Sequence, residues 1–185
     1  SLKGYNTDYV AAIEAIENAM EKKTGVAAAK SLDGKTVVVI GAGGAGKALA
    51  FGAKFKGAHV VIANRSVERA QALADACGGV AVSLEDLASG SVVGDVLANS
   101  TSVGMQPNVE DTPTPVSVLG GFSVVFDAVY TPLETRLLRE AKACVCEIAS
   151  GLDMFVGPAA RQFELFTGKE AGVELMRDAV LSSIK

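Results

Sequence analysis

The sequence predicts an α/β fold, a doubly wound parallel sheet of six strands with helices on both faces. Two observations carry this prediction. Short apolar or β-branched runs alternate along the chain with longer segments of helical apolar spacing. The first of these runs, Thr36 to Ile40, is followed at once by a glycine-rich turn and an Ala-rich segment. Right-handed crossovers then give the strand order 3-2-1-4-5-6.

The predicted strands are short and mostly apolar, as expected for strands covered on both faces of a parallel sheet. They are Thr36 to Ile40, His59 to Ala63, Val80 to Ser83, Val96 to Asn99, Val124 to Ala128 and Val145 to Ala149. The predicted helices are Tyr9 to Lys23, Gly46 to Phe55, Val67 to Cys77, Leu84 to Leu87, Glu134 to Ala143, Phe155 to Thr167 and Val173 to Ser183. Gln106 to Pro115 holds three of the five Pro and is predicted to be a loop.

Composition limits the class of protein. The chain has 185 residues, 49% hydrophobic, and a formal net charge of −4 from 17 Lys plus Arg against 21 Asp plus Glu. We expect one domain, residues 1–185, that binds neither nucleic acid nor membrane, because it has no basic cluster and no apolar run long enough to span a bilayer. The three Cys and the lone His59 do not have the spacing of a metal site, so no metal is expected. Free thiols indicate a reducing compartment.

The most informative motif is Gly41-Ala42-Gly43-Gly44-Ala45-Gly46, which matches GxGxxG. It lies between a predicted buried strand and a predicted helix, the context that a Rossmann dinucleotide site requires. Gly41 permits a tight turn, Gly43 lets the backbone approach a pyrophosphate, and Gly46 lets the helix pack close to the sheet. The alternative is a glycine-rich turn that holds no ligand.

The end of the second predicted strand indicates which dinucleotide binds. NAD-binding proteins place Asp or Glu there, on the ribose 2′-hydroxyl. This chain has Asn64-Arg65-Ser66, with Arg69 one helical turn further on. Arg65 can pair with a 2′-phosphate and stack on adenine, and Ser66 can donate another hydrogen bond. The residues therefore favour NADP, although Arg65 could also be an ordinary surface side chain.

Polar residues also follow the remaining strands, where a ligand of an open α/β sheet is expected. Asn99 to Met105 follows the fourth strand, Asp127 to Pro132 includes the end of the fifth, and Ser150 to Met154 follows the sixth. We expect these segments to line the nicotinamide half of the cleft, although each polar residue alone could be an ordinary loop residue.

Taken together, these motifs resemble the shikimate dehydrogenase family, in particular the NADP-binding part of enzymes that are fused after a 3-dehydroquinate dehydratase in plants. The resemblance covers nearly the whole chain. It rests on Gly4 to Asp8, Gly41 to Lys47, Asn64 to Ser66, Asn99 to Met105, Asp127 to Pro132 with Thr135 to Leu138, Gly151 to Phe155 and Gln162 to Glu164. It implies reversible NADPH-dependent reduction of 3-dehydroshikimate to shikimate, a step in aromatic amino-acid biosynthesis. It further implies a plastid location if the plant-type resemblance holds, and a cytoplasmic one otherwise.

The resemblance also implies site residues. Asp8 would form a catalytic dyad with a Lys and bind substrate, together with Tyr130 and Gln162. From the residues alone, Asp8 or Thr7 could instead cap the first helix. The residues expected to contact NADP are Gly41, Ala42, Gly43, Gly44, Ala45, Asn64, Arg65, Ser66, Arg69, Thr101, Ala128, Gly151 and Met154.

Two departures from the family pattern affect the expected activity. The family's catalytic Lys and a Ser-containing substrate loop precede the segment Gly4 to Asp8, so we expect them in an upstream substrate domain and expect residues 1–185 alone to be inactive. The chain also has Pro158 where the family has a substrate-binding Gln. This leaves a quinate dehydrogenase, or a non-catalytic NADP-binding module, as alternatives. Finally, Val10, Ile13, Ile16, Met20, Phe155, Phe163 and Phe166 are expected to form an exposed apolar patch where the upstream domain docks.

Overall fold

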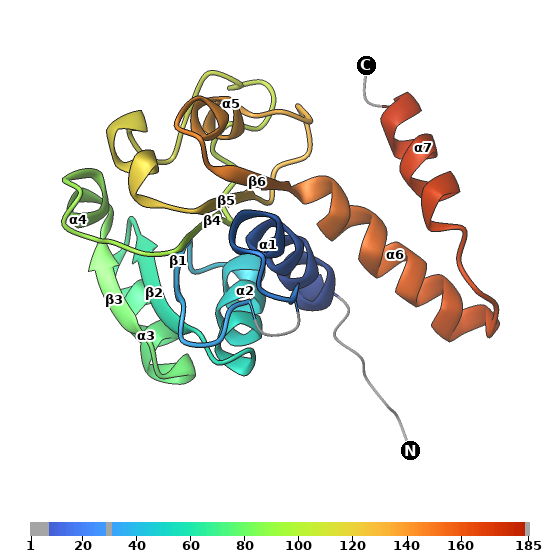
Figure 1. The fold of residues 1–185 in the computed structure, drawn as a ribbon, viewed down its shortest axis with the longest axis horizontal. Helices are drawn as coiled ribbons and strands as arrows, with labels where there is room; N and C mark the ends of the chain where they lie inside the picture. Colours follow the sequence, from blue (N-terminus) through green and yellow to red (C-terminus); the bar gives the residue numbers. More distant parts are fainter. Residues whose placement is uncertain (1–7, 29–30, 184–185) are drawn as a thin grey trace.

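The computed structural model describes residues 8–28 and 31–183, and the side chains from residue 10 onward. Its centre is a six-stranded sheet of order β3-β2-β1-β4-β5-β6 in which all neighbours are parallel, which confirms the predicted fold class and strand order (Figure 1). The strands are β1 (Thr36–Ile40), β2 (His59–Asn64), β3 (Val80–Ser83), β4 (Val96–Asn99), β5 (Val124–Asp127) and β6 (Glu147–Ser150). The helices are α1 (Asp8–Thr24), α2 (Gly44–Phe55), α3 (Val67–Cys77), α4 (Leu84–Ala88), the 3-10 helix η2 (Val116–Gly121), α5 (Arg136–Ala143), α6 (Gly151–Thr167) and α7 (Val173–Ser183).

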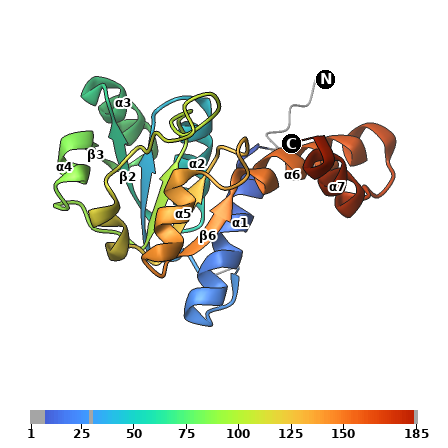
Figure 2. The same cartoon turned by 90° about the horizontal axis from the view of Figure 1, so that it is seen from above.

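Strand β1 shows why its apolar residues run without a break. Val37 and Val39 face the core formed with α1, α2 and α3, whereas Val38 and Ile40 face the core formed with α4, η2 and α5. Alternate side chains of a strand point to opposite faces, so a strand that is covered on both sides is apolar at every position. Figure 2 shows the two helical layers on either side of the sheet.

The sheet register places the carboxyl ends of the central strands in one row. Ile40 is paired with Asn99, Asn99 with Asp127, and Asp127 with Ser150. The polar residues that end three successive strands therefore lie side by side at one edge of the sheet. The loops and helix N-termini that follow them must meet above this edge, where ligands of such folds bind.

Several elements begin or end one or two residues from their predicted limits, as α2 and α5 do, and three of the differences have a physical reason. β6 begins at Glu147 rather than Val145, because Val145 is 75% exposed and has a left-handed φ of 62°, which ends α5 instead of starting a strand. α6 begins at Gly151 rather than Phe155. η2 was not expected; it packs Val118 and Leu119 under the sheet where a longer helix would otherwise form the crossover.

The prediction of an exposed apolar docking patch is wrong for the residues of α1. Ile13, Ile16 and Met20 are at most 1% exposed and belong to the core beneath the sheet, so only Val10 of that stripe is open to solvent. The α6 half is as expected: Phe155, Phe163 and Phe166 are 46%, 39% and 86% exposed. In Figure 1, α6 and α7 extend away from the sheet, and α7 buries none of its residues.

We predict that Gly46→Ala lowers the free energy of unfolding by roughly 1–3 kcal/mol, the usual cost of overpacking. A Cβ on Gly46 would lie 2.3 Å from the carbonyl oxygen of Gly41 and 2.9 Å from the Ser100 hydroxyl. Urea denaturation without ligand measures the effect. Gly44→Ala in the same helix is the matched control, because nothing lies within 4 Å of its Cβ position. Equal losses in both variants would contradict the prediction.

Candidate functional site

The turn between β1 and α2 has the geometry that its glycines suggested. Gly41 has a φ of 106°, which side chains rarely adopt, and its backbone N–H donates to the carbonyl of Ala63 at 2.8 Å. The Cβ positions of Gly41 and Gly46 are blocked by Ser100 and by the Gly41 carbonyl. The Ser100 hydroxyl donates to the Ile40 carbonyl at 2.7 Å and so holds the next loop against this turn. The chain therefore leaves β1 and enters α2 with almost no space between them.

The N-terminus of α2 is open toward the sheet edge. Gly43 is the N-cap, supplies no capping side chain, and no acidic residue lies in the first turn. By contrast, Ser66, Ser83 and Thr135 cap α3, α4 and α5 with their hydroxyls. No heavy atom lies within 4 Å of a Cβ built on Gly43 or Gly44. Free N–H groups, the helix dipole and this empty space suit a phosphate, so the residues present fit a dinucleotide's pyrophosphate.

The end of β2 carries cations that no ion pair uses in the described part of the chain. Arg65 and Arg69 are both exposed, and neither takes part in any of the ion pairs found there. Asn64 donates from its amide to the carbonyl of Ser66 at 3.0 Å and shapes the turn between these residues. Two unpaired guanidinium groups beside the phosphate-binding turn fit a second phosphate.

Two charged residues near this position were missed by the sequence analysis. The Ser66 hydroxyl accepts from the N–H of Arg69 at 3.3 Å and donates to the Glu68 carboxylate at 2.8 Å, which lowers the pKa of Glu68. To donate to a phosphate, Ser66 must release Glu68. Lys47, to which the sequence analysis gave no role, lines an open cavity of about 540 Å³ between α2 and α3 together with Ala42 and Arg69.

A second cavity, of about 290 Å³, lies beyond the ends of β4 and β5. It is lined by Ser100, Thr101, Ser102, Met105, Ala128, Val129, Tyr130 and Thr131. Three of the predicted site residues, Thr101, Ala128 and Tyr130, therefore share one cavity. The start of α6 closes against the same loop, since a Cβ on Gly151 would lie 2.1 Å from the Ala128 carbonyl oxygen. Met154 packs against the same core as Ala42 and Ala128.

A buried carboxylate, that of Asp127, directly precedes the lining residue Ala128 along the chain. Asp127 is fully buried and accepts hydrogen bonds from the Asn99 amide at 2.9 Å, the Val129 N–H at 3.0 Å and the Thr135 hydroxyl at 2.6 Å. Burial raises the pKa of Asp127 from 3.8 to about 6, and the three hydrogen bonds act in the opposite direction. Sequence reasoning placed this residue at the site but gave it no role.

The residues expected to contact substrate are less completely placed. Tyr130 is half-buried and its ring lies 4.7 Å from that of Phe155, between ring centroids. Gln162 is exposed on α6, seven residues after Phe155 and so about 10 Å further along the helix. The side chain of Asp8 lies outside the described residues, although the residue begins α1.

Pro158 is not in the first turn of its helix, where the sequence analysis placed it. Because α6 begins at Gly151, Pro158 lies inside the helix and is buried. A proline has no N–H, so the carbonyl four residues earlier, that of Met154, receives no hydrogen bond from it. The departure from the family pattern therefore changes the backbone beside a predicted cofactor residue as well as a side chain.

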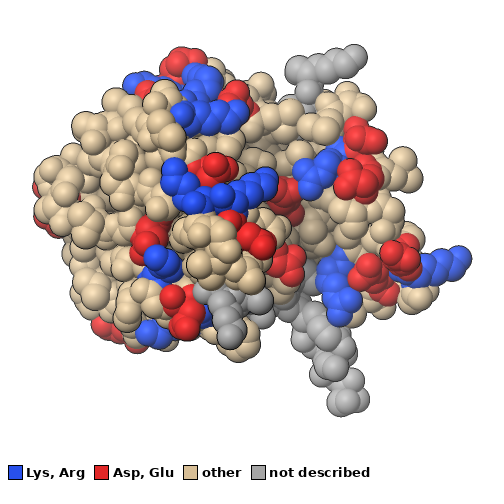
Figure 3. All heavy atoms as spheres, viewed as in Figure 1, with Lys and Arg blue, Asp and Glu red and all other residues tan. Residues whose placement is uncertain are grey.

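The described residues contain no group of three or more His, Cys, Asp or Glu arranged to hold a metal ion. Within residues 8–28 and 31–183, no helix combines the length and apolarity needed to cross a bilayer. Lys and Arg side chains are interspersed with Asp and Glu on the face seen in Figure 3.

Comparisons with known proteins agree with this geometry. Residues 22–109 match the shikimate / quinate 5-dehydrogenase family, and residues 151–181 match the shikimate 5′-dehydrogenase C-terminal domain. The chain is 56% identical over 179 residues to the chloroplastic bifunctional 3-dehydroquinate dehydratase/shikimate dehydrogenase of Arabidopsis thaliana, covering 94% of this chain and 30% of that protein.

Solved structures give the same result. The shikimate 5-dehydrogenase of Thermus thermophilus in complex with NADP(H) and shikimate has a TM-score of 0.76 at 36% identity, over 95% of this chain and 62% of that one. The quinate dehydrogenase of Corynebacterium glutamicum in complex with NAD has a TM-score of 0.79 at 35% identity, over 97% and 63%. The chain thus spans less than two thirds of the length of these proteins. It belongs to the shikimate dehydrogenase family.

We predict that Asp127 makes stability fall as the pH rises from about 4 to about 6. The folded protein holds the Asp127 proton more tightly than the unfolded chain, because burial raises the pKa of this group in the folded state. The free energy of unfolding should therefore decline across that window, by up to about 3 kcal/mol relative to Asp127→Asn, which cannot titrate. Urea denaturation of both proteins between pH 4 and 7 measures this difference.

Asp178→Asn on α7, an exposed position, controls for the change in net charge. A difference between wild type and Asp127→Asn that does not vary with pH, or that varies in the opposite direction, would refute the assignment.

Proposed function

We propose that residues 1–185 form the NADP(H)-binding domain of a shikimate dehydrogenase, which interconverts 3-dehydroshikimate and shikimate. The observation that carries this proposal is the β1–α2 turn, open to an anion, together with Arg65 and Arg69, which form no ion pair within the described residues. Membership of the family supports it, as does the binding of NADP(H) and shikimate by the Thermus relative. We propose that a substrate domain, encoded outside residues 1–185, completes the enzyme.

The pyrophosphate would lie at the N-terminus of α2. The N–H groups of the first turn would bind it, and Gly41 to Ala45 would leave room for it because Gly43 and Gly44 have open Cβ positions. The adenosine half would then extend over the end of β2, as in other folds of this type. Asn64, Ser66 and the two arginines lie there, and the guanidinium groups would bind a 2′-phosphate.

The nicotinamide half would lie over the ends of β4 and β5. Thr101 and Ala128 line the cavity there, and Gly151 and Met154 approach from the start of α6. When bound, NADP(H) supplies or accepts the hydride. The polypeptide would position the ring between these residues and exclude water with the apolar faces of Ala128 and Met154.

Substrate would lie beyond the nicotinamide, beside Tyr130. We propose that Asp8 and a Lys of the substrate domain move a proton to or from the substrate oxygen as the hydride moves, and that Gln162 contacts the substrate. The contact between the Tyr130 and Phe155 rings, which are tilted by 30°, restricts where the Tyr130 hydroxyl can point.

Quinate dehydrogenase is the second candidate. Pro158 favours it, because it removes the amide with which family members hold shikimate. The quinate dehydrogenase of Corynebacterium glutamicum, crystallised with NAD, is 35% identical. We also propose a plastid location, supported by the chloroplastic Arabidopsis relative.

We predict that the chain binds NADPH at least about ten-fold more tightly than NADH, since a charge-assisted phosphate contact contributes about 1.5–3 kcal/mol. Arg65→Asp should abolish most of that preference. Glu68→Gln should strengthen NADPH binding slightly, because it removes a negative charge beside Ser66. Isothermal titration calorimetry measures both affinities. Arg161→Asp, an exposed position on α6, makes the same charge change away from β2. Equal affinities in the wild type would refute the assignment of Arg65.

We predict that the protein joined to its substrate domain oxidises shikimate with NADP⁺, and that Asp8→Asn lowers kcat by about 10²- to 10⁴-fold, the usual contribution of general acid–base catalysis. Absorbance at the NADPH band measures turnover with shikimate and with quinate. A preference for quinate would support the second candidate. NADPH binding without turnover of either compound would indicate a non-catalytic module.

A further inference from the structure

Asp127 is fully buried, and no cation among the described residues balances its charge. None of the ion pairs in residues 8–28 and 31–183 includes Asp127, and its carboxylate is held by three hydrogen-bond donors alone. Desolvation disfavours such a group, as its raised pKa reflects. An apolar residue would be more favourable at the end of a buried strand, so the carboxylate needs a reason other than packing.

The three donors come from three different segments. Asn99 is the last residue of β4, Val129 belongs to the loop after β5, and Thr135 is the N-cap of α5. The Thr135 hydroxyl also accepts from the N–H of Leu138 at 3.3 Å. Oδ1 of Asp127 accepts from Asn99 and Val129, whereas Oδ2 accepts from Thr135. One planar carboxylate therefore sets the relative positions of all three segments.

Asn99 carries this restraint into the loop after β4. Its Oδ1 accepts from the backbone N–H of Thr101 at 3.0 Å and from the Thr101 hydroxyl at 2.7 Å. The Thr101 hydroxyl in turn accepts from the N–H of Val103 at 3.2 Å. The chain of hydrogen bonds thus runs from α5 through Asp127 and Asn99 to the cavity wall at Thr101.

We propose that Asp127 is a positioning residue, which holds the loops after β4 and β5 at the separation that admits the nicotinamide half of the dinucleotide. The proposal rests on the proposed function. Residues 100–102 and 128–131 line the cavity of about 290 Å³. Asn99 and Asp127, which are hydrogen-bonded to each other and buried, directly precede these two segments along the chain. The adenosine half would lie over β2, which the strand order places on the other side of β1 from β4 and β5, so Asp127 should have no effect there.

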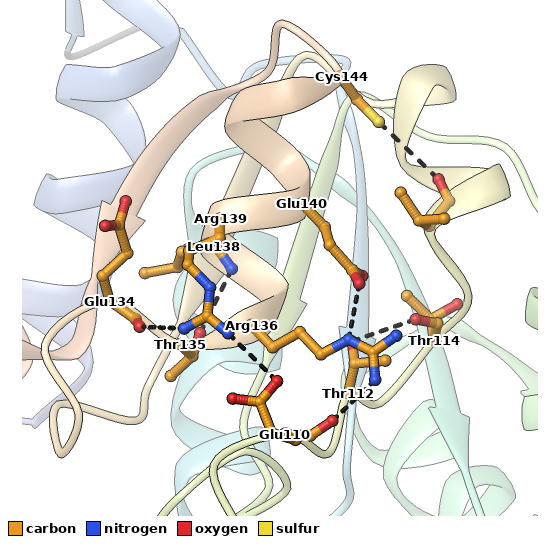
Figure 4. A network of polar contacts seen from close by, with 11 residues as sticks. Glu110, Thr112, Thr114, Glu134, Thr135, Arg136, Leu138, Arg139, Glu140 and Cys144 are labelled. Atoms are coloured by element: carbon orange, nitrogen blue, oxygen red, sulfur yellow. Dashed lines mark hydrogen bonds and ion pairs between the residues drawn. The ribbon is translucent and has the colours of Figure 1, made fainter.

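Three variants test the coupling. Thr135→Val keeps the shape of the side chain and removes the donor to Asp127, whereas Thr135→Ser keeps the donor. Asp127→Asn keeps an oxygen that can accept from Asn99 and Val129, and weakens only the hydrogen bond with the Thr135 hydroxyl. Thr114→Val is the matched control: Thr114 is 3% exposed, and its hydroxyl has no hydrogen-bond partner among the described residues. Figure 4 shows Thr114 beside Thr112 and near the side chain of Arg136, and no hydrogen bond found in the described residues joins it to Asp127.

We expect Thr135→Val to weaken NADPH binding by roughly three- to ten-fold, the equivalent of one lost hydrogen bond, and Asp127→Asn to weaken it less. The affinity for 2′,5′-ADP, which lacks the nicotinamide half, should stay within about two-fold of the wild type. Thr135→Ser should restore NADPH binding, and Thr114→Val should not change it. Equal weakening of both ligands, or unchanged NADPH affinity in Thr135→Val, would overturn the proposal.

A measurement without ligand separates this proposal from the proposed function. In NMR spectra of the ligand-free chain, Thr135→Val should shift the amide resonances of Thr101 and Val103, which the hydrogen-bond chain reaches only through Asp127. Shifts confined to residues 127–138 would overturn the proposal. If the wild type binds neither NADPH nor 2′,5′-ADP, the proposed function fails, and these resonances still decide whether Asp127 couples the two loops.

Discussion

The close approach of α2 to the end of β1 is the constraint on which the candidate site depends. Gly46 has no Cβ, so the first turn of α2 can lie against the carbonyl of Gly41, and Gly41 can adopt the φ of 106° that this geometry needs. Ser100 then closes the same space from β4. Because helix, turn and neighbouring loop are in contact, the N-terminus of α2 is held at the carboxyl end of the sheet, where Gly43 and Gly44 are exposed.

The two halves of that edge use electrostatics in different ways. On the β2 side, Arg65 and Arg69 are exposed, so their charges cost little to maintain in the absence of a ligand and can pair with a phosphate when one arrives. On the β5 side the charge is Asp127, which is buried and already has three donors. The groups proposed to bind phosphate are thus at the surface, whereas the group proposed to position the loops is inside, where water cannot compete for its hydrogen bonds.

The local parts of this arrangement could be predicted from sequence. Strand β1 and helix α3 were predicted to the residue, because apolar runs and a terminal glycine mark their limits. The glycines of the motif lie next to one another along the chain, and Arg65 and Arg69 lie within one helical turn. The partners of Asp127 are more distant: Asn99 precedes it by 28 residues and is brought beside it by the strand register, and Thr135 follows by eight, at the N-cap of α5. A polar residue ending each of two buried apolar runs was the available signal.

The predicted start of α6 was wrong because it too depends on a contact between distant residues. Its apolar residues suggested a start at Phe155, but the helix begins at Gly151 because its backbone docks on the Ala128 carbonyl, a contact that the sequence does not reveal. This docking brings Gly151 and Met154 to the candidate site, while the far end of α6 and all of α7 remain exposed. α7 is held by α6, in part through the Arg177–Asp153 ion pair. Elements with few buried residues open most easily, so local unfolding should begin in α7 and spare the docked end of α6 that reaches the site.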